Sequence, residues 1–221
     1  MSNQCWLTLL QGSNAHAASG GKVIAVIRAA KMEQAYHMAK AVASGGIQLI
    51  EITWNSDRAA ELISQLRAEL PACTVGTGTL LTLLQMEQAI AAGAQFLFTP
   101  HVDPVMIQAA VQRSVPIIPG ALSPTEIVTA WATGASCVKV FPVQSMGGIS
   151  YLKSLQGPLG HIPLIPTGGV TLENAKEFIA AGAIAVGLSG DLFPQQLVAV
   201  QNWDAIAQRA RKLMEQLATD Y

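Results

Sequence analysis

The feature of this sequence that most constrains its fold is a series of eight short apolar runs separated by segments of helical periodicity. The runs lie at 23–28, 49–53, 74–79, 96–99, 117–118, around Lys139, at 164–167 and at 184–188. Short runs that are apolar throughout are typical of parallel strands buried on both faces. Helices are expected at 3–11, 32–44, 57–69, 82–92, 103–112, 123–133, 172–181 and 203–217.

Strands that alternate with helices indicate a parallel sheet with right-handed crossovers, and eight strands close a (β/α)8 barrel. The repeated Ala-Gly-Ala at 92–94 and 181–183 marks two equivalent helix-to-strand turns. A doubly wound open sheet is the alternative, but no GxGxxG motif joins a strand to a helix here. The length of 221 residues suits one domain. We therefore predict a single α/β domain over 1–221, a TIM barrel with a short N-terminal helix.

Charge and composition exclude several classes of partner. The net charge is -1 with no long run of one sign, which disfavours nucleic acids and anionic membranes. No segment has the roughly 18 uninterrupted apolar residues of a membrane helix. We expect a soluble, cytoplasmic protein with small-molecule partners. Neither a disulfide framework nor a metal site is suggested by the scattered cysteines and histidines: Cys5, Cys73, Cys137, His16, His37, His101 and His161.

A single lysine lies at the centre of the apolar run 136–142. Catalytic groups of barrel enzymes lie at the C-terminal ends of the strands. Because strand residues alternate between the barrel interior and the helix layer, an inward Lys139 leaves Val138 and Val140 to pack on helices. Glu51 points inward by the same rule. The two opposite charges would then share one barrel interior.

This pair suggests covalent chemistry. A free lysine has a pKa of about 10.4 and is a poor nucleophile until apolar walls or a second cation, such as Arg28, release its amine. The amine could then attack a ketone, and the resulting iminium is an electron sink. Glu51 is the carboxylate available as proton shuttle. The alternative is a strand lysine that reaches solvent, with Glu51 as a structural partner.

Two glycine-rich loops, 167–171 and 187–190, follow the seventh and eighth runs. Loops in these positions commonly form the phosphate site of a TIM barrel, because glycines expose their backbone N–H groups. Glycine required by a tight turn is the alternative explanation. The succession of the two loops favours a phosphorylated substrate.

From about residue 22 to residue 217 the chain resembles the bacterial KDPG/KHG aldolases, class I aldolases that cleave 2-keto-3-deoxy-6-phosphogluconate (KDPG). The motifs that carry the resemblance are Leu49-Ile50-Glu51-Ile52-Thr53, Gly76-Thr77-Gly78-Thr79, Phe98-Thr99-Pro100, Ile118-Pro119-Gly120, Val138-Lys139-Val140-Phe141-Pro142 and Pro166-Thr167-Gly168-Gly169-Val170. It implies reversible cleavage to pyruvate and glyceraldehyde 3-phosphate, use of 4-hydroxy-2-oxoglutarate as a further possible substrate, a homotrimer, and no metal or organic cofactor.

The resemblance also implies roles for individual residues. Lys139 matches the Schiff-base lysine, and Glu51 the general acid/base acting through a water. Thr79 matches a threonine that helps bind the pyruvyl part. Further candidate contacts are Arg28, Pro100, Phe141, Thr167 and Asn55 for the substrate, and Gly168, Gly169, Ser189 and Gly190 for the phosphate.

Two departures bear on the substrate. Many family members carry arginine at the position of Asn55, where it binds the pyruvate carboxylate. Here Arg28, at the end of the first strand, resembles the carboxylate arginine of the related phosphogalactonate aldolases. The segment 187–193 and His101 also resemble that branch of the family. Val143-Gln144 stands where an Ala-Glu pair is frequent in the gluconate branch. The sequence thus predicts KDPG as substrate, with its C4 epimer, the phosphogalactonate compound, as the alternative.

Two other classes of protein could bind a phosphorylated ligand with the same glycine-rich loops. A phosphosugar isomerase or synthase on this barrel would not need Lys139 as an amine. A non-catalytic phosphosugar-binding barrel would gain thermal stability from its ligand without turnover.

Overall fold

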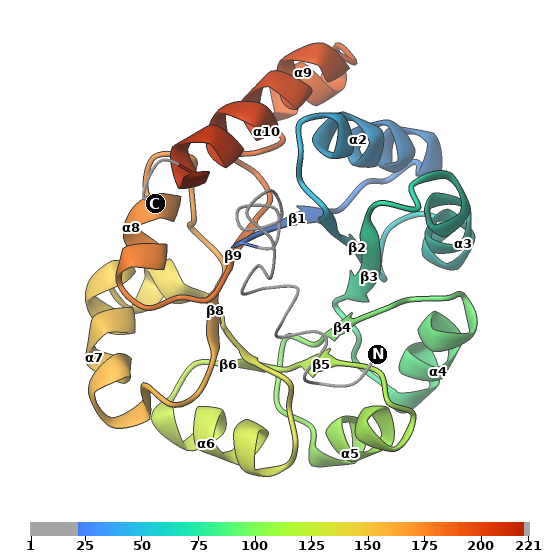
Figure 1. The fold of residues 1–221 in the computed structure, drawn as a ribbon. Helices are drawn as coiled ribbons and strands as arrows, with labels where there is room; N and C mark the ends of the chain where they lie inside the picture. Colours follow the sequence, from blue (N-terminus) through green and yellow to red (C-terminus); the bar gives the residue numbers. More distant parts are fainter. Residues whose placement is uncertain (1–21, 219–221) are drawn as a thin grey trace.

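The computed structural model describes residues 22–218, in which parallel strands form a central ring surrounded by helices (Figure 1). The strands are β1 (Val23–Ile27), β2 (Leu49–Thr53), β3 (Thr74–Gly78), β4 (Leu97–Phe98), β5 (Ile117–Ile118), β6 (Gly120–Ala121), β7 (Val138–Val140), β8 (Leu164–Pro166) and β9 (Val186–Leu188). The helices are α2 (Met32–Ser44), α3 (Ala59–Glu69), α4 (Leu83–Ala91), α5 (Pro104–Gln112), α6 (Pro124–Ala132), η2 (Val143–Met146, a 3-10 turn), α7 (Ile149–Leu159), α8 (Ala175–Ala180), α9 (Gln195–Ala199) and α10 (Trp203–Ala218).

Hydrogen bonding closes the strands into a barrel. One sheet runs β5-β4-β3-β2-β1-β9 and the other β6-β7-β8, with parallel pairing throughout. β5 and β6 are one barrel strand interrupted at Pro119, which has no N–H to donate to a sheet. A parallel bridge between Thr167 and Gly187 joins β8 to β9. The predicted (β/α)8 barrel is confirmed.

Two apolar cores follow from the alternation of side chains along the strands. The inner core fills the barrel and consists of Ile24, Val26, Leu49, Phe96, Phe98, Ile118, Cys137, Ile165 and Ala185. The outer core lies between strands and helices and includes Ile50, Ile52, Val138 and Val140. Since Cys137 and Leu49 belong to the inner core, Lys139 and Glu51, two residues further along, point into the barrel as the alternation predicts.

Two helix starts have the predicted caps. The Asp103 carboxylate accepts hydrogen bonds from the N–H groups of Val105 (2.8 Å) and Met106 (3.3 Å), and Pro104 occupies the first turn. Ser123 and Glu126 form a capping box at the start of α6. These contacts fix where α5 and α6 begin, after the loops that border the barrel mouth.

The sequence reading missed or misplaced several elements. It gave no bounds for α7, whose last turn contains Gly157 and Pro158, both helix-breaking signals. It omitted α9, whose five residues are too few to show periodicity. The helix expected from 172 is regular only from Ala175; residues 172–174 form a turn in which the side chains of Thr171 and Asn174 accept hydrogen bonds from each other's backbone N–H groups.

Other predictions extend beyond the described residues. The opening helix expected at 3–11 lies outside them, and the single domain over 1–221 stays a prediction for the complete chain. Within residues 22–218, no helix combines the length and apolar character needed to span a bilayer.

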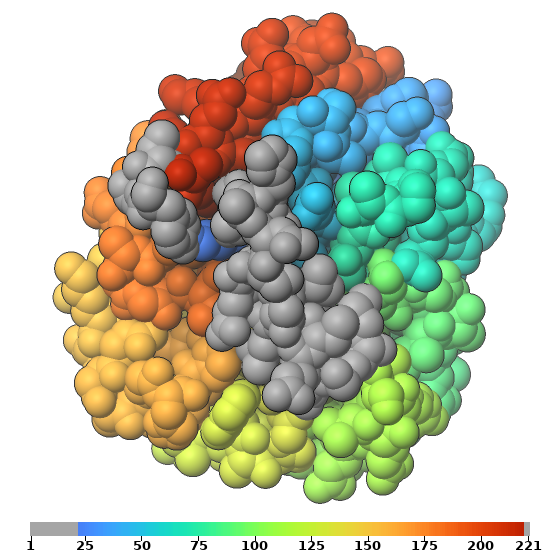
Figure 2. Space-filling model, viewed as in Figure 1, coloured from blue at the N-terminus to red at the C-terminus, as the bar shows by residue number. Residues whose placement is uncertain are grey.

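Helix α10 returns to pack against α2, so the end of the helix ring meets its beginning. Figure 2 shows the red residues of α10 against the blue residues of α2. The contact is close at Gly45, which follows α2: a Cβ there would lie 2.5 Å from the Ala210 Cβ and 2.6 Å from the Ala207 carbonyl oxygen. The absence of a side chain at Gly45 therefore sets the distance between these helices.

We predict that Gly45→Ala lowers the free energy of unfolding by about 1–3 kcal/mol, because the added methyl group must push the two helices apart. Gly157→Ala in α7 is the matched control, since a Cβ there meets nothing within 4 Å. That control should change the free energy of unfolding by less than about 1 kcal/mol, because the helical advantage of alanine is opposed by Pro158, which disfavours helical backbone at a preceding residue with a Cβ. Urea unfolding of both variants measures the difference, and equal effects would contradict the close packing at Gly45.

Candidate active site

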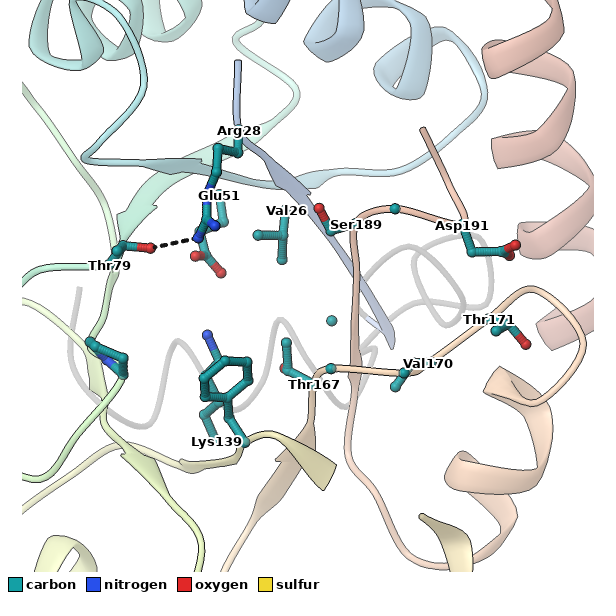
Figure 3. Close-up of a pocket in the computed structure, with 16 residues that line it drawn as sticks. Val26, Arg28, Glu51, Thr79, Lys139, Thr167, Val170, Thr171, Ser189 and Asp191 are labelled. Carbon is teal, nitrogen blue, oxygen red and sulfur yellow. Dashed lines mark hydrogen bonds between the residues drawn. The ribbon is translucent and has the colours of Figure 1, made fainter. Parts of the chain in front are cut away.

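A cavity of about 510 Å³ opens at the C-terminal ends of the barrel strands. All the site residues predicted from sequence except Asn55 line it: Arg28, Glu51, Thr79, Pro100, Lys139, Phe141, Thr167, Gly168, Gly169, Ser189 and Gly190. They come from strands or loops around the whole ring, and the barrel brings them together (Figure 3). Asn55 is exposed in the turn after β2, where it is not part of the cavity wall.

Lys139 lies on β7 with its side chain directed into the cavity (Figure 3). Only 6% of the residue is exposed. Its amine nitrogen lies 4.9 Å from the ring centroid of Phe141 and 5.4 Å from that of Phe98. The two aromatic rings shield the amine from bulk water on their sides and leave it open toward the cavity.

Glu51, in the middle of β2, faces Lys139 across the barrel (Figure 3). Burial raises the pKa of its carboxyl above the ordinary value, while attraction to Lys139 and Arg28 acts in the opposite direction. Among the described residues its Oε1 has no hydrogen-bond partner. A buried carboxyl with a raised pKa and a free oxygen is suited to accept and return a proton.

Two glycines of β3 make room for the inner side chains. A Cβ on Gly78 would lie 1.8 Å from the Glu51 Oε1, and a Cβ on Gly76 would lie 2.4 Å from the Phe96 ring. The Gly76-Thr77-Gly78 motif thus leaves space inside the barrel while Thr77 points outward, donating to the Ile52 carbonyl at 2.7 Å.

Arg28 follows β1 and borders the cavity mouth. Its Nη2 donates to the Thr79 hydroxyl at 3.5 Å, the contact drawn as a dashed line in Figure 3. Thr79 has a φ of 60°, a left-handed conformation that is uncommon for a β-branched residue. This backbone turns the Thr79 hydroxyl toward Arg28, so a guanidinium and a hydroxyl converge on the same side of the cavity.

The glycine-rich loops lie on the side of β8 and β9. Gly168 and Gly169 have positive φ values of 85° and 94°, which few other residues adopt. Gly187 leaves room for Thr167, since a Cβ there would lie 2.5 Å from the Thr167 Oγ1. Exposed loop N–H groups, with Ser189, can bind an anion at this end.

Two residues that line the cavity lie outside the loops and strand ends predicted from the sequence, Val26 and Asp191, whereas the lining residues Val170, Thr171 and Gly187 belong to the predicted loops. The alternation along β1 could have identified Val26, and Asp191 directly follows the second predicted loop. Within the described part of the chain, no three His, Cys, Asp or Glu side chains are grouped as a metal ion would require.

The fold and the cavity define a (β/α)8 barrel with a lysine and a carboxyl facing each other beside two anion-binding loops. Residues 16–209 match the sequence model of the family described as KDPG and KHG aldolase. The chain belongs to this family. It is 34% identical over 194 residues to a 2-dehydro-3-deoxy-phosphogluconate aldolase of Treponema pallidum, covering 88% of this chain and 92% of the relative. It is 31% identical over 195 residues to the KHG/KDPG aldolase of Escherichia coli, with coverage of 88% and 92%.

Solved structures of proteins named as KDPG aldolases also resemble this chain. The KDPG aldolase of Legionella pneumophila, with pyruvate captured as a covalent carbinolamine, has a TM-score of 0.82 and 28% identity over 91% of this chain and 98% of that one. A structure described as native KDPGal has a TM-score of 0.79 and 30% identity, with coverage of 88% and 95%. A designed cage built by fusing symmetric oligomeric domains contains a chain with a TM-score of 0.76 and 30% identity, with coverage of 88% and 74%.

We predict that Glu51→Gln raises the melting temperature near neutral pH by a few degrees, the shift that about 1 kcal/mol gives in a chain of this size. Because the folded-state pKa is raised, ionisation destabilises the folded state as pH rises above the ordinary value of 4.5. Below that value the carboxyl is protonated in both states, so the gain from glutamine should vanish there.

Thermal unfolding of the wild type and Glu51→Gln across this pH range measures the effect. Glu177→Gln, at an exposed position of α8, is the control and should show no such pH-dependent gain. A lower melting temperature for Glu51→Gln near neutral pH would mean that attraction to Lys139 outweighs the cost of burial.

Proposed function

We propose that this chain is a class I aldolase that reversibly cleaves KDPG to pyruvate and glyceraldehyde 3-phosphate. The observation that carries the proposal is the buried amine of Lys139, which faces Glu51 in a cavity whose other end is formed by two glycine-rich loops. Membership of the KDPG and KHG aldolase family supports it.

In the proposed reaction the Lys139 amine attacks the C2 ketone of the substrate and forms a carbinolamine. Loss of water gives an iminium, which draws electrons from the C3–C4 bond. A base removes the proton of the C4 hydroxyl as that bond breaks, so glyceraldehyde 3-phosphate leaves and an enamine remains. Protonation of the enamine at C3 and hydrolysis then release pyruvate and regenerate the amine.

Glu51 is the proposed acid and base for these proton transfers. Burial raises the pKa of its carboxyl, so both protonation states are accessible nearer to neutral pH than for an exposed glutamate. Its free Oε1 supplies an acceptor for a substrate hydroxyl or a bridging water. The aromatic walls of Phe98 and Phe141 limit access of bulk water to the iminium.

Arg28 and Thr79 are the proposed contacts for the keto-acid carboxylate, because their polar groups converge on one side of the cavity that Lys139 also lines. Pro100 and Phe141 supply apolar wall, and Thr167 a hydroxyl, along the carbon chain. Gly168, Gly169, Ser189 and Gly190 are the proposed phosphate contacts at the opposite end. The substrate would then lie across the barrel mouth with its ketone over Lys139.

The C4 epimer of KDPG, the phosphogalactonate compound, is the alternative substrate. Arg28, which resembles the carboxylate arginine of the phosphogalactonate branch, lies in the cavity, and Asn55 lies outside it. Assaying the two epimers and 4-hydroxy-2-oxoglutarate side by side distinguishes the substrates, and we expect KDPG to give the highest kcat/KM.

We also propose a homotrimer. Large apolar side chains are exposed on consecutive helices of the ring: Leu84 (63%) on α4, Val105 (62%) on α5 and Val128 (46%) on α6. Such a surface is typical of a contact between subunits, and a similar domain is used among the symmetric oligomeric parts of the designed cage. Independence from any cofactor and a cytoplasmic location stay predictions from the sequence.

We predict that borohydride reduction in the presence of pyruvate attaches one 1-carboxyethyl group, derived from pyruvate, to the Lys139 amine, because hydride addition to the iminium converts it to a stable secondary amine. Intact-mass and peptide mass spectrometry measure the adduct. Lys139→Arg should abolish it, whereas Lys153→Arg, at an exposed position of α7, should leave it unchanged. An unmodified wild-type protein would exclude the Schiff-base reaction and favour a phosphosugar isomerase, a synthase or a binding barrel.

We predict that Arg28→Ala raises the KM for KDPG on the order of tenfold or more, because a charge-assisted contact to the carboxylate is lost. Asn55→Ala should change the KM less than about twofold, since Asn55 lies outside the cavity. Steady-state kinetics of both variants test this. Equal, small effects of the two substitutions would show that Arg28 does not bind the carboxylate.

A further inference from the structure

Asp191 is an unexpected residue for the wall of a phosphate site, because its carboxylate has the same sign of charge as the ligand. It directly follows Gly190 and lines the cavity together with the glycine-rich loops (Figure 3). Sequence analysis assigned it no role beyond its place in the segment 187–193. Its contacts indicate what it does there.

The Asp191 side chain joins the two loops. Its Oδ2 accepts a hydrogen bond from the Leu172 N–H at 2.8 Å, and Leu172 belongs to the segment that follows β8. Asp191 itself belongs to the segment that follows β9. This hydrogen bond therefore spans two segments that are otherwise separated by α8 and β9 in the chain.

Arg209 of α10 holds Asp191 from outside the barrel. Its Nε and Nη2 donate to the Asp191 backbone carbonyl at 3.1 Å and 2.6 Å, and its Nη2 lies 3.4 Å from the carboxylate Oδ1. One guanidinium thus contacts both the backbone and the side chain of the same residue. Such a forked arrangement restricts the loop more than a single hydrogen bond would.

The first loop is also fixed internally. The Asn174 side chain donates to the Gly169 carbonyl at 3.1 Å and accepts from the Thr171 N–H at 2.8 Å. The loop that carries Gly168 and Gly169 is therefore a preformed turn, and the Asp191 contact determines where the second loop lies relative to it.

Besides holding the loop, the positive charge of Arg209 compensates the negative charge of Asp191. A carboxylate without a partner, a few ångströms from a phosphate, would repel it and weaken its binding. The ion pair with Arg209 offsets the charge of Asp191, so the cavity end can accept an anion although a carboxylate lines it.

We propose that Arg209 and Asp191 are positioning residues that set the spacing of the two glycine-rich loops and thereby determine affinity for the phosphorylated end of the substrate. The inference rests on the proposed aldolase function. Neither residue takes part in the bonds made and broken at Lys139. Substituting them should therefore weaken binding of phosphorylated substrates and leave the reaction of Lys139 with a ketone unchanged.

The test compares two reactions of Arg209→Gln. We expect the KM for KDPG to rise about tenfold, because the second loop loses its anchor and the Asp191 charge is no longer offset. Hydrogen exchange at the methyl group of pyruvate, which needs Lys139 but no phosphate, should stay within about twofold of the wild type. Arg211→Gln, at an exposed position of the same helix, is the matched control and should leave both reactions unchanged.

A second variant separates charge from anchoring. Adding Asp191→Asn to Arg209→Gln removes the repulsion and keeps an oxygen that can accept from Leu172, so part of the affinity for KDPG should return. Parallel losses in both reactions, or an unchanged KM for KDPG, would overturn the assignment. If the wild type formed no pyruvate adduct with Lys139, the proposed function would fail instead, so the two failures are distinguishable.

Discussion

The burial of two opposite charges inside one closed barrel is the constraint on which the rest of this structure depends. Lys139 and Glu51 are almost inaccessible, and a buried charge is tolerated only when another charge or a hydrogen bond compensates it. Attraction between the two side chains opposes the cost of burying Glu51 without cancelling it, so the pKa of the carboxyl stays raised. The imbalance that costs stability is the same property that suits Glu51 to proton transfer.

The site is shaped as much by missing side chains as by those present. Gly78 leaves space for the Glu51 carboxylate, Gly76 for the Phe96 ring and Gly187 for Thr167. Because the strands are hydrogen-bonded into a ring, the interior cannot widen to admit extra atoms, and each large inner side chain needs a small residue beside it. The glycines of these motifs therefore have a packing role besides any contact with a ligand.

The loops after β8 and β9 show how the outer layer acts on the cavity. Arg209 lies on the last helix, which packs against α2, and it contacts Asp191 at the cavity wall. The contact between α10 and α2 that closes the helix ring thus also supports the helix that anchors a loop of the site. The position of an anion at the barrel mouth would then depend on packing outside the barrel.

The sequence by itself determined the barrel, the inward direction of Lys139 and Glu51, and the two glycine-rich loops, because strand alternation and turn chemistry are local properties. It also indicated Arg28. Only the tertiary structure decided that Asn55 lies outside the cavity and that Asp191 joins the loops through Leu172 and Arg209. Those outcomes depend on contacts between residues far apart in the chain, whose distances are set when the ring closes and α10 packs onto it.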